Sequence, residues 1–394
     1  MKFILYLYSR LRFEIAFFGV IMLVMPLFKQ KIQKALAEVD VIVGGARPWD
    51  IIVHDERLYG KIILHGSVGL GEAYMNGWWD CADLPEFFYR VLRGRLHVKY
   101  KAPGQDIFHF ISNLFNKQTL EKSLEVGERH YDIGNDLYKA MLDKRMIYSC
   151  GYWQGAKTLD EAQENKLDLI CQKLKLKKGD RVLDIGCGWG GFAKYAAEKY
   201  GAQVTGITIS KEQAALAKEL TKDLPVDIQF LDYRKIEGKF DYIVSIGMFE
   251  HVGHKNYRTF MKIVEKHLKD DGIFLLHTLG GNFSGIDVDT WTEKYIFPNG
   301  ILPTIGNIGK AIEGLFVVED WHNFSADYEK TLLAWHENFE KSWPQLQNKY
   351  SKNFHRMWGY YLLCYAGAFR ARDNQLWQIV LSKGGLLGGY QSIR

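Results

Sequence analysis

The sequence lacks the features of several large protein classes. Its 394 residues include only 8 prolines and 5 cysteines, and no two cysteines form a CxxC pair. An odd, widely spaced set predicts neither a disulfide framework nor a zinc site, and it favours a reducing compartment. The set is Cys81, Cys150, Cys171, Cys187 and Cys364. Glycine and proline follow no period, which excludes collagen-like and low-complexity proteins.

A convincing membrane-spanning segment is also lacking. Residues 15–28 contain 14 uncharged residues between basic flanks, whereas a spanning helix needs about 20. No small-x-small cleavage site follows, so an export signal is disfavoured as well. An interfacial or packed N-terminal helix, or an extended start of the gene, fits better. We therefore leave the role of residues 1–34 open.

The composition is that of a folded globular chain, with 47% hydrophobic and 25% charged residues. Its length predicts two or three domains. The net charge of +5 is uneven, because residues 1–120 carry 15 Lys or Arg against 11 Asp or Glu. Basic residues concentrate in residues 87–122. Such a patch suits nucleic acid or an anionic membrane, and a solvated linker is the plainer alternative.

An apolar run inside this basic region favours lipid. Asp106–Phe115 places Ile107, Phe108, Ile111 and Leu114 at helical spacing, as in a helix that lies in a membrane interface. We therefore expect an anionic membrane surface as the partner, and no nucleic acid.

The second part of the chain alternates helical segments with continuous apolar runs. Apolar strands separated by helices predict a mostly parallel sheet buried on both faces, with its ligand beyond the carboxyl ends of the strands. Residues 36–100 instead suggest a small mixed α/β unit, with strand-like runs at Asp50–Val53 and Ile62–Leu64. The expected strands of the sheet are residues 181–186, 202–210, 227–233, 240–249, 272–280, 314–321 and 376–382.

A glycine-rich turn follows the first of these strands. Gly186, Gly188 and Gly191 match GxGxxG, which alone is a weak sign of a dinucleotide site. A nicotinamide-binding fold also requires a carboxylate about 20 residues further on, which binds the ribose. At that place this chain has residues 206–210, GITIS. The preceding Asp184, and Asp232 after the third strand, resemble the class I S-adenosylmethionine-dependent methyltransferases. A purely structural turn is the remaining alternative.

Six stretches of sequence indicate one particular family within this class of methyltransferases. They are HYDIGNDLY (130–138), YSCGYW (148–153), VLDIGCGWGG (182–191), GMFEHVGHKNY (247–257), FLLHTLG (274–280) with KYIFPNG (294–300), and EDWHNF (319–324) with GAFRARD (367–373). Together they resemble the bacterial cyclopropane-fatty-acyl-phospholipid synthases, relatives of the mycolic acid cyclopropane synthases. The resemblance begins near residue 36.

The resemblance implies a fold and an activity. The fold is a class I S-adenosylmethionine-dependent methyltransferase, α/β with a Rossmann-like, seven-stranded, mostly parallel sheet and a smaller N-terminal α/β domain. We divide the chain into an extension (1–34), a small lipid-binding domain (35–95), a basic amphipathic linker (96–125) and a catalytic domain (126–394). The activity is methylene transfer to the cis double bond of an unsaturated phospholipid acyl chain.

The chemistry sets its own demands. An alkene is a weak nucleophile, so the methyl donor must be aligned with it and water excluded. Methyl transfer leaves a carbocation, and ring closure needs a base that removes a proton from the new methyl group. Aromatic faces stabilise a cation by about 0.5 to 2 kcal/mol each. The site therefore needs aromatic rings beside a small basic constellation.

By resemblance, a bound bicarbonate ion is that base. The resemblance places it on Cys150, Glu250, His277, Tyr328 and the backbone of Leu279, where relatives usually carry Ile. It makes Tyr131 and Tyr148 the aromatic rings that face the cation. The same resemblance assigns the cofactor, S-adenosylmethionine, to Tyr148, Ser149, Asp184, Gly186, Gly188, Thr208, Gln213, Asp232 and Tyr233. No metal is expected.

Plainer interpretations exist for most of these residues. A free cysteine such as Cys150 is usually a small buried hydrophobe, and Glu250 could cap a helix. His277 on an apolar strand would ordinarily be a satisfied core histidine. We interpret His251 as structural and Cys364 as packing.

Alternatives to the activity also stay open. A related enzyme could give a methyl-branched or otherwise modified chain, and a lipid-binding protein could keep the fold without catalysis. We expect a cytoplasmic protein peripherally bound to the inner face of the membrane, and the resemblance suggests a homodimer. Headgroup and acyl-position preference are not predicted.

Overall fold

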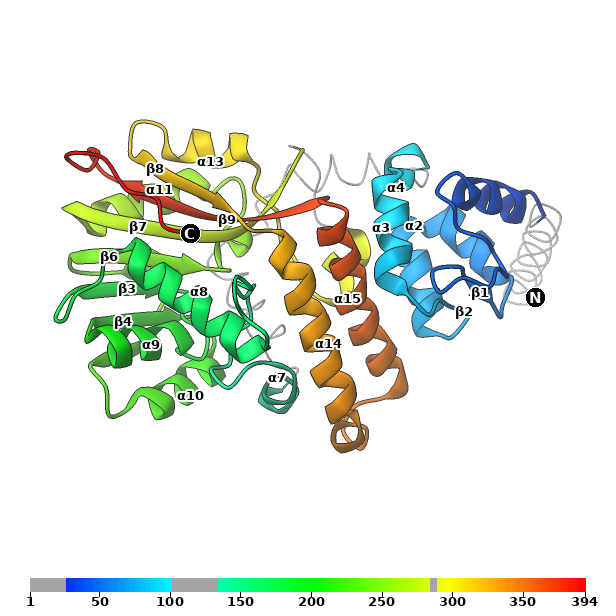
Figure 1. The fold of residues 1–394 in the computed structure, drawn as a ribbon, viewed down its shortest axis with the longest axis horizontal. Helices are drawn as coiled ribbons and strands as arrows, with labels where there is room; N and C mark the ends of the chain where they lie inside the picture. Colours follow the sequence, from blue (N-terminus) through cyan, green and yellow to red (C-terminus); the bar gives the residue numbers. More distant parts are fainter. Residues whose placement is uncertain (1–25, 101–133, 284–288) are drawn as a thin grey trace, which may run out of the picture.

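The computed structural model describes residues 26–100, 134–283 and 289–394 (Figure 1). Residues 1–25 and 101–133 lie outside this range, and with them most of the apolar run at 15–28, the amphipathic segment 106–115 and Tyr131. Within the described part of the chain, no helix is long and apolar enough to cross a membrane.

The core of the molecule is a seven-stranded sheet in the order β5-β4-β3-β6-β7-β9-β8. All neighbours pair in parallel except β9, which runs antiparallel to both β7 and β8. The predicted methyltransferase fold is confirmed. The strands are β3 (Arg181–Ile185), β4 (Gln203–Thr208), β5 (Val226–Phe230), β6 (Phe240–Ile246), β7 (Leu268–Gly281), β8 (Val317–Asn323) and β9 (Asn374–Ser382).

Helices cover both faces of the sheet, which explains why its central strands are mostly apolar (Figure 1). All nine residues of β9 are buried. One face carries α8 (Leu159–Lys173), α9 (Gly191–Tyr200) and α10 (Lys211–Thr221), and the other carries α11 (Tyr257–His267) and α13 (Ile305–Ile312). The short elements η1 (Tyr233–Lys235), η2 (Phe249–His251), α7 (Asn135–Met141) and α12 (Thr290–Tyr295) lie in the connections.

A hairpin of two long helices, α14 (Ala326–Leu346) and α15 (Lys352–Arg370), lies between the sheet and the front unit (Figure 1). The front unit is mostly helical. It contains a helix at residues 26–37, α2 (Arg57–Met75), α3 (Leu84–Arg93), α4 (Leu96–Lys99) and the two-stranded ribbon of β1 (Ile52–Val53) and β2 (Trp79–Asp80).

One expectation for the front unit was wrong. Ile62–Leu64 is not a strand, because it lies inside α2. A short apolar run does not by itself distinguish a strand from a buried helix turn. The run at Asp50–Val53 does contain β1.

The front unit shares one hydrophobic core with α15. Trp79 and Phe88 of the front unit contact the ring of Tyr360 on α15 edge-on, with centroids 6.5 and 5.3 Å apart. Arg370 of α15 forms ion pairs with Glu86 of α3 and Glu329 of α14. The front unit is therefore fixed against the helices that also border the sheet, and the domain limits set out above stay a prediction.

Gly367 permits the close approach of α15 and α3. A Cβ atom added there would lie 2.5 Å from the carbonyl oxygen of Pro85 and 2.7 Å from Cβ of Phe88. We expect Gly367→Ala to lower the free energy of unfolding by about 1 to 3 kcal/mol, because the helices must separate.

The matched control is Gly309→Ala on α13, where an added Cβ meets no atom within 4 Å. That variant should be neutral, or more stable by up to about 1 kcal/mol, since alanine favours helix. Denaturant unfolding measures both variants. Equal stabilities would show that the contact between α3 and α15 is not tight.

Candidate active site

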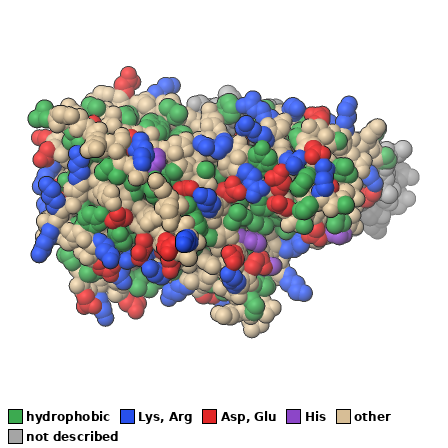
Figure 2. Space-filling view, viewed as in Figure 1, with side chains coloured by type: hydrophobic (Ala, Val, Ile, Leu, Met, Phe, Trp, Pro, Cys, Tyr) green, Lys and Arg blue, Asp and Glu red, His purple; other side chains and the backbone are tan. Residues whose placement is uncertain are grey.

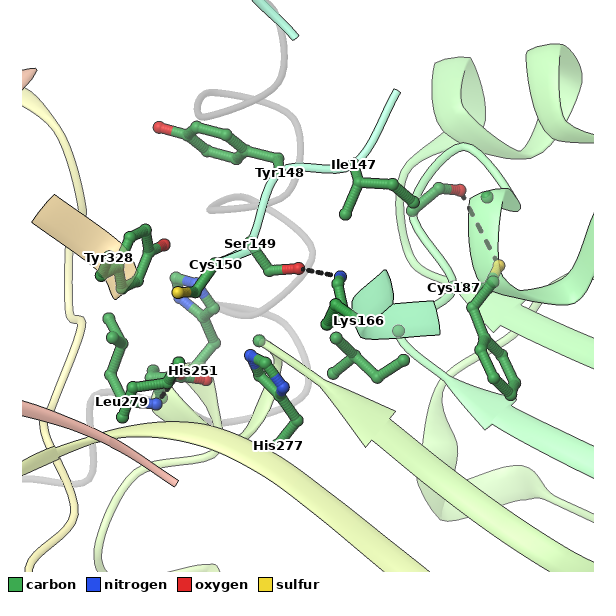
Figure 3. Close-up of a pocket in the computed structure, with 18 of the residues that line it drawn as sticks. Ile147, Tyr148, Ser149, Cys150, Lys166, Cys187, His251, His277, Leu279 and Tyr328 are labelled. Atoms are coloured by element: carbon green, nitrogen blue, oxygen red, sulfur yellow. Dashed lines mark hydrogen bonds between the residues drawn. The ribbon is translucent and has the colours of Figure 1, made fainter. Parts of the chain in front are cut away.

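A cavity opens at the carboxyl ends of β3, β6 and β7, where the sequence predicted a ligand site. Residues 146–150, α8, α14 and α15 complete its wall. Figure 3 shows side chains from these separate elements turned towards a common space. Eleven of the predicted site residues line it: Tyr148, Ser149, Cys150, Asp184, Gly186, Gly188, Gln213, Glu250, His277, Leu279 and Tyr328.

The glycine-rich turn forms one side of the cavity. Gly186 and Gly188 have φ angles of 84° and 55°, in the left-handed region that favours glycine. At Gly191, a Cβ would lie 2.2 Å from Cδ1 of Ile147 and 2.7 Å from the carbonyl oxygen of Arg145. The turn therefore brings bare backbone and the start of α9 up to the cavity, as a bound cofactor requires.

Asp184, the last acidic residue before this turn, is buried, and its Oδ1 has no hydrogen-bond partner in the described structure. Burial raises the pKa of Asp184 to about 7, although nearby Lys166 acts in the opposite direction. An orphaned carboxylate oxygen at the cavity edge fits a ligand that carries a hydrogen-bond donor.

Lys166 is a site residue that the sequence interpretation missed. It is fully buried on α8, and its Nζ donates to Oγ of Ser149 at 2.8 Å (Figure 3). Burial lowers the pKa of Lys166 to about 8, and the charges of Asp143 and Asp184 oppose that shift. The available signal was its position, four residues from Ala162 and from Ile170 on the buried face of the helix.

The remaining predicted cofactor residues lie outside the cavity wall. Thr208 donates through Oγ1 to Oε1 of Gln213 at 3.0 Å, and so orients a residue that does line the cavity. Asp232 accepts from the amide of Arg234 at 2.9 Å. The ring of Tyr233 packs edge-on against Phe260 in the core. A role of Tyr233 towards the cofactor would therefore have to use its backbone.

Glu250 lies on η2 and lines the cavity. Its Oε1 accepts from the amide of Leu279 at 2.6 Å, while its Oε2 is buried without a partner in the described structure. Burial raises the pKa of Glu250 to about 7, so a substantial fraction of the carboxyl groups carries a proton near neutral pH. The Leu279 amide, expected to contact the anion, is directed to Glu250.

His277 comes from β7 and faces the same space (Figure 3). Its Nδ1 is 3.2 Å from Nε2 of Gln378, and its Nε2 is buried with no partner in the described structure. Burial and the nearby Lys166 and Lys173 hold the pKa of His277 well below its usual value, so the ring is neutral. A neutral imidazole carries one donor and one acceptor.

Aromatic side chains and Cys150 fill the rest of the wall. Tyr148 shares a hydrogen bond with the hydroxyl of Tyr361 at 2.9 Å and packs against Trp335. Cys150 is fully buried with its Sγ 3.1 Å from the carbonyl oxygen of Gly151, and burial raises the pKa of its thiol. It is therefore a neutral thiol, unsuited to act as a free nucleophile.

Other lining residues were also missed, including Trp189, Phe297, Tyr361 and Tyr365. His251, interpreted as structural, lines the cavity, and burial lowers its pKa to about 4. Cys364 packs against the main core cluster, as expected. In the described ranges, no three His, Cys, Asp or Glu side chains are grouped to hold a metal ion.

The fold and the site together define the class. A glycine-rich turn after the first strand of this sheet, with an acidic residue before it and aromatic rings opposite, is the arrangement of a class I S-adenosylmethionine-dependent methyltransferase. The fold is shared even with coclaurine N-methyltransferase, at 21% identity and a TM-score of 0.63.

Closer relatives place the chain more narrowly. The family model "Mycolic acid cyclopropane synthetase" matches residues 118–379. A cyclopropane-fatty-acyl-phospholipid synthase of Escherichia coli is 50% identical over 350 residues, which is 89% of this chain and 92% of that protein. A mycolic acid cyclopropane synthase structure, CmaA1 with SAH and CTAB, is 31% identical with a TM-score of 0.62 over 66% of this chain and 98% of that one. The chain belongs to the cyclopropane synthase family of S-adenosylmethionine-dependent enzymes.

The buried carboxyl group of Glu250 makes a prediction about stability. Between about pH 4.5 and 7 the unfolded chain releases this proton while the folded protein keeps it, so the contribution of Glu250 to the stability of the wild type falls as pH rises. Glu250→Gln removes that loss. Relative to the wild type, the variant should gain on the order of 3 kcal/mol across this window.

Denaturant unfolding of the ligand-free protein at a series of pH values measures this difference. Glu219→Gln, at an exposed position on α10, is the matched control and should follow the wild type. A difference between Glu250→Gln and wild type that does not change with pH would contradict the raised pKa.

Proposed function

We propose that this enzyme transfers a methylene group from S-adenosylmethionine to the cis double bond of an unsaturated phospholipid acyl chain and forms a cyclopropane ring. One observation carries the proposal: Oε2 of Glu250 and Nε2 of His277 are buried without partners in the wall of one cavity. Buried polar atoms nearly always have partners, so this pair fits a small polar group between them. The name of the Escherichia coli relative supports the lipid substrate.

The residues present fit bicarbonate as that group. Near neutral pH the carboxyl of Glu250 can donate through its proton, and the hydroxyl of Tyr328 borders the same cavity. Bicarbonate bound there would supply the base that takes a proton from the transferred methyl group. Leu279 contributes by holding Oε1 of Glu250, which leaves Oε2 directed to the anion.

The chain's own part in the reaction is to shield and orient. Rings of Tyr148, Tyr361 and Phe297 line the cavity and exclude water from a carbocation on the acyl chain. Their faces stabilise positive charge by about 0.5 to 2 kcal/mol each. The hydroxyl pair of Tyr148 and Tyr361 fixes two of these rings. Tyr131 keeps its predicted role at the cation and lies outside the described residues.

The side of the cavity formed by the glycine-rich turn after β3 fits S-adenosylmethionine, which supplies the methyl group. Its methionine part carries an ammonium and a carboxylate, and Asp184 and Lys166 offer the complementary groups beside Gly186 and Gly188. Ser149, which accepts from Lys166, stands next to Cys150 and joins the two halves of the site. Gln213 replaces the ribose carboxylate of nicotinamide-binding folds.

The test is incubation of the protein with S-adenosylmethionine, bicarbonate and vesicles of unsaturated phospholipid, followed by mass spectrometry of the acyl chains. We expect a gain of one CH₂ with loss of the double bond. Glu250→Gln should lower kcat by about 100-fold or more and spare S-adenosylmethionine binding, because the polar pocket for the anion is altered. Removal of bicarbonate should slow the wild type.

Glu219→Gln serves again as the control. A gain of one CH₂ with the double bond retained would establish a methyl- or methylene-branched product instead. Unchanged chains with intact S-adenosylmethionine binding would show that the substrate is not a phospholipid acyl chain.

We also propose that the enzyme works at an anionic membrane surface on its cytoplasmic side. On the face shown in Figure 2, acidic and basic side chains are interspersed. Attraction to an anionic membrane must therefore come from a few exposed basic residues. Arg93 and Arg95 are exposed. Arg90 is different, because it forms ion pairs with Glu86 and Asp40. Replacing Arg90 would test folding and not membrane binding.

The double variant Arg93→Glu, Arg95→Glu should bind anionic vesicles more weakly and keep its affinity for S-adenosylmethionine, since basic residues near a membrane contribute about 1 kcal/mol each. Lys218→Glu, Lys222→Glu is the matched charge control, because Lys218 on α10 and Lys222 at its C-cap are both exposed. Vesicle sedimentation measures both. Unchanged binding of the first variant would remove this surface from the proposal. A homodimer remains a prediction, to be measured by sedimentation velocity.

A further inference from the structure

A chain of buried polar groups leads away from the cavity across the neighbouring strands β7, β9 and β8. It begins at His277 on β7 and passes to Gln378 on the neighbouring β9. It continues to Lys173 on α8, and ends at His322 and Asp320 on β8. His277, Gln378 and Lys173 are each at most 1% exposed. Neither the motifs nor the proposed reaction uses Gln378 or Lys173.

The distances in this chain are those of hydrogen bonds. Nζ of Lys173 is 2.9 Å from Oε1 of Gln378 and 3.0 Å from Nδ1 of His322. The other end of the Gln378 amide, Nε2, is 3.2 Å from Nδ1 of His277. Asp320, 3.9 Å from Nζ, compensates the buried ammonium.

The chemistry of these groups assigns a direction to every bond. An ammonium group only donates, so Lys173 fixes which end of the Gln378 amide is its oxygen. The amide nitrogen of Gln378 must then face His277 and donate to it. Nδ1 of His277 is therefore an acceptor, and in a neutral ring the proton is left on Nε2. Nε2 is the buried nitrogen without a partner at the cavity.

We propose that Lys173 and Gln378 are positioning residues, which fix His277 in the tautomer that presents an Nε2–H donor to the cavity. The inference rests on the proposed function for the identity of the group that accepts this hydrogen bond. In the other tautomer Nε2 would present a lone pair, which repels an oxyanion. Loss of the orienting partner of a metal-bound histidine typically lowers activity about 10- to 100-fold, and we expect an effect of that size here.

A structural role alone does not explain the arrangement. A fully buried lysine is expensive to desolvate, and an apolar residue of similar size would fill the space between α8 and the sheet. The segment after β9 adds further contacts to this one spot. Arg394 forms an ion pair with Asp320, and the hydroxyl of Tyr390 donates to the carbonyl oxygen of Lys173 at 2.9 Å.

The experiment records ¹H–¹⁵N spectra of the full chain with ¹⁵N-labelled histidine rings, assigned to His277 by the signal lost in His277→Gln. Burial lowers the pKa of Lys173 to about 7, so spectra taken somewhat below pH 7 keep its ammonium while His277 stays neutral. We expect the proton on Nε2 in the wild type. A proton on Nδ1, or on both nitrogens, overturns the proposal.

Gln378→Glu keeps the shape of the side chain and its bond to Lys173 but replaces the donor with an acceptor. The proton of His277 should move to Nδ1, and kcat should fall about 10- to 100-fold with KM for S-adenosylmethionine unchanged. Lys173→Met, which leaves the amide of Gln378 free to turn, should give both tautomers. If Gln378→Glu fails to fold, the wild-type and Lys173→Met spectra still show whether Lys173 and Gln378 fix the tautomer of His277.

The matched control is Gln375→Glu on the same strand. Gln375 bonds to Asn323, Ser325 and Arg372 and not to His277, so its substitution should leave the His277 signals in place. Unchanged signals and unchanged kcat in Gln378→Glu also overturn the proposal. The proposed function is tested separately, by whether the wild type forms a cyclopropane product. The His277 spectrum reports the tautomer whatever the outcome of that assay.

Discussion

Removal of water from the carboxyl edge of the sheet is the constraint on which the rest of the site depends. Burial raises the pKa of Glu250 to about 7, keeps His277 neutral and makes Cys150 an unreactive thiol. In the proposed reaction, the same burial would protect a carbocation, which water would quench. The ionisation states of these side chains and the protection of the reacting acyl chain thus have one cause, which is burial. That cause is supplied by the helices α14 and α15 and by residues 146–150, which close the cavity over the strand ends.

The sheet was largely predictable because its central strands are buried on both faces and therefore contain long apolar runs. The helical turn at Ile62–Leu64 looked like a strand for the same reason. Site residues in motifs, such as Glu250 and Asp184, were also predictable. Lys173 and Gln378 were not, and Lys166 was missed although its position on the buried face of α8 was a signal, because residues of these types are mostly exposed. Only the tertiary packing gives them partners.

The cavity and the surface that we propose for membrane binding belong to one mechanical unit. Trp79 and Phe88 pack against Tyr360, and Arg370 joins α3 to α14. Arg93 ends the helix that makes these contacts. A lipid held at that end of α3 would therefore stand at a set position relative to α15, whose Tyr361 lines the cavity. A lipid held in this way reaches the cavity in a defined orientation, which lowers the entropic cost of aligning its acyl chain for reaction.

The place of β9 has a consequence for how the chain acquires its structure. β9 is inserted between β7 and β8, yet it follows both in sequence. During synthesis, β8 has no neighbour to pair with, and the edge of β7 stays open, until residues 374–382 have left the ribosome. Pairings of high sequence separation form slowly and leave strand edges exposed in the meantime. The nascent chain is therefore most prone to aggregate just before its last strand appears, and chaperones should engage it at that stage.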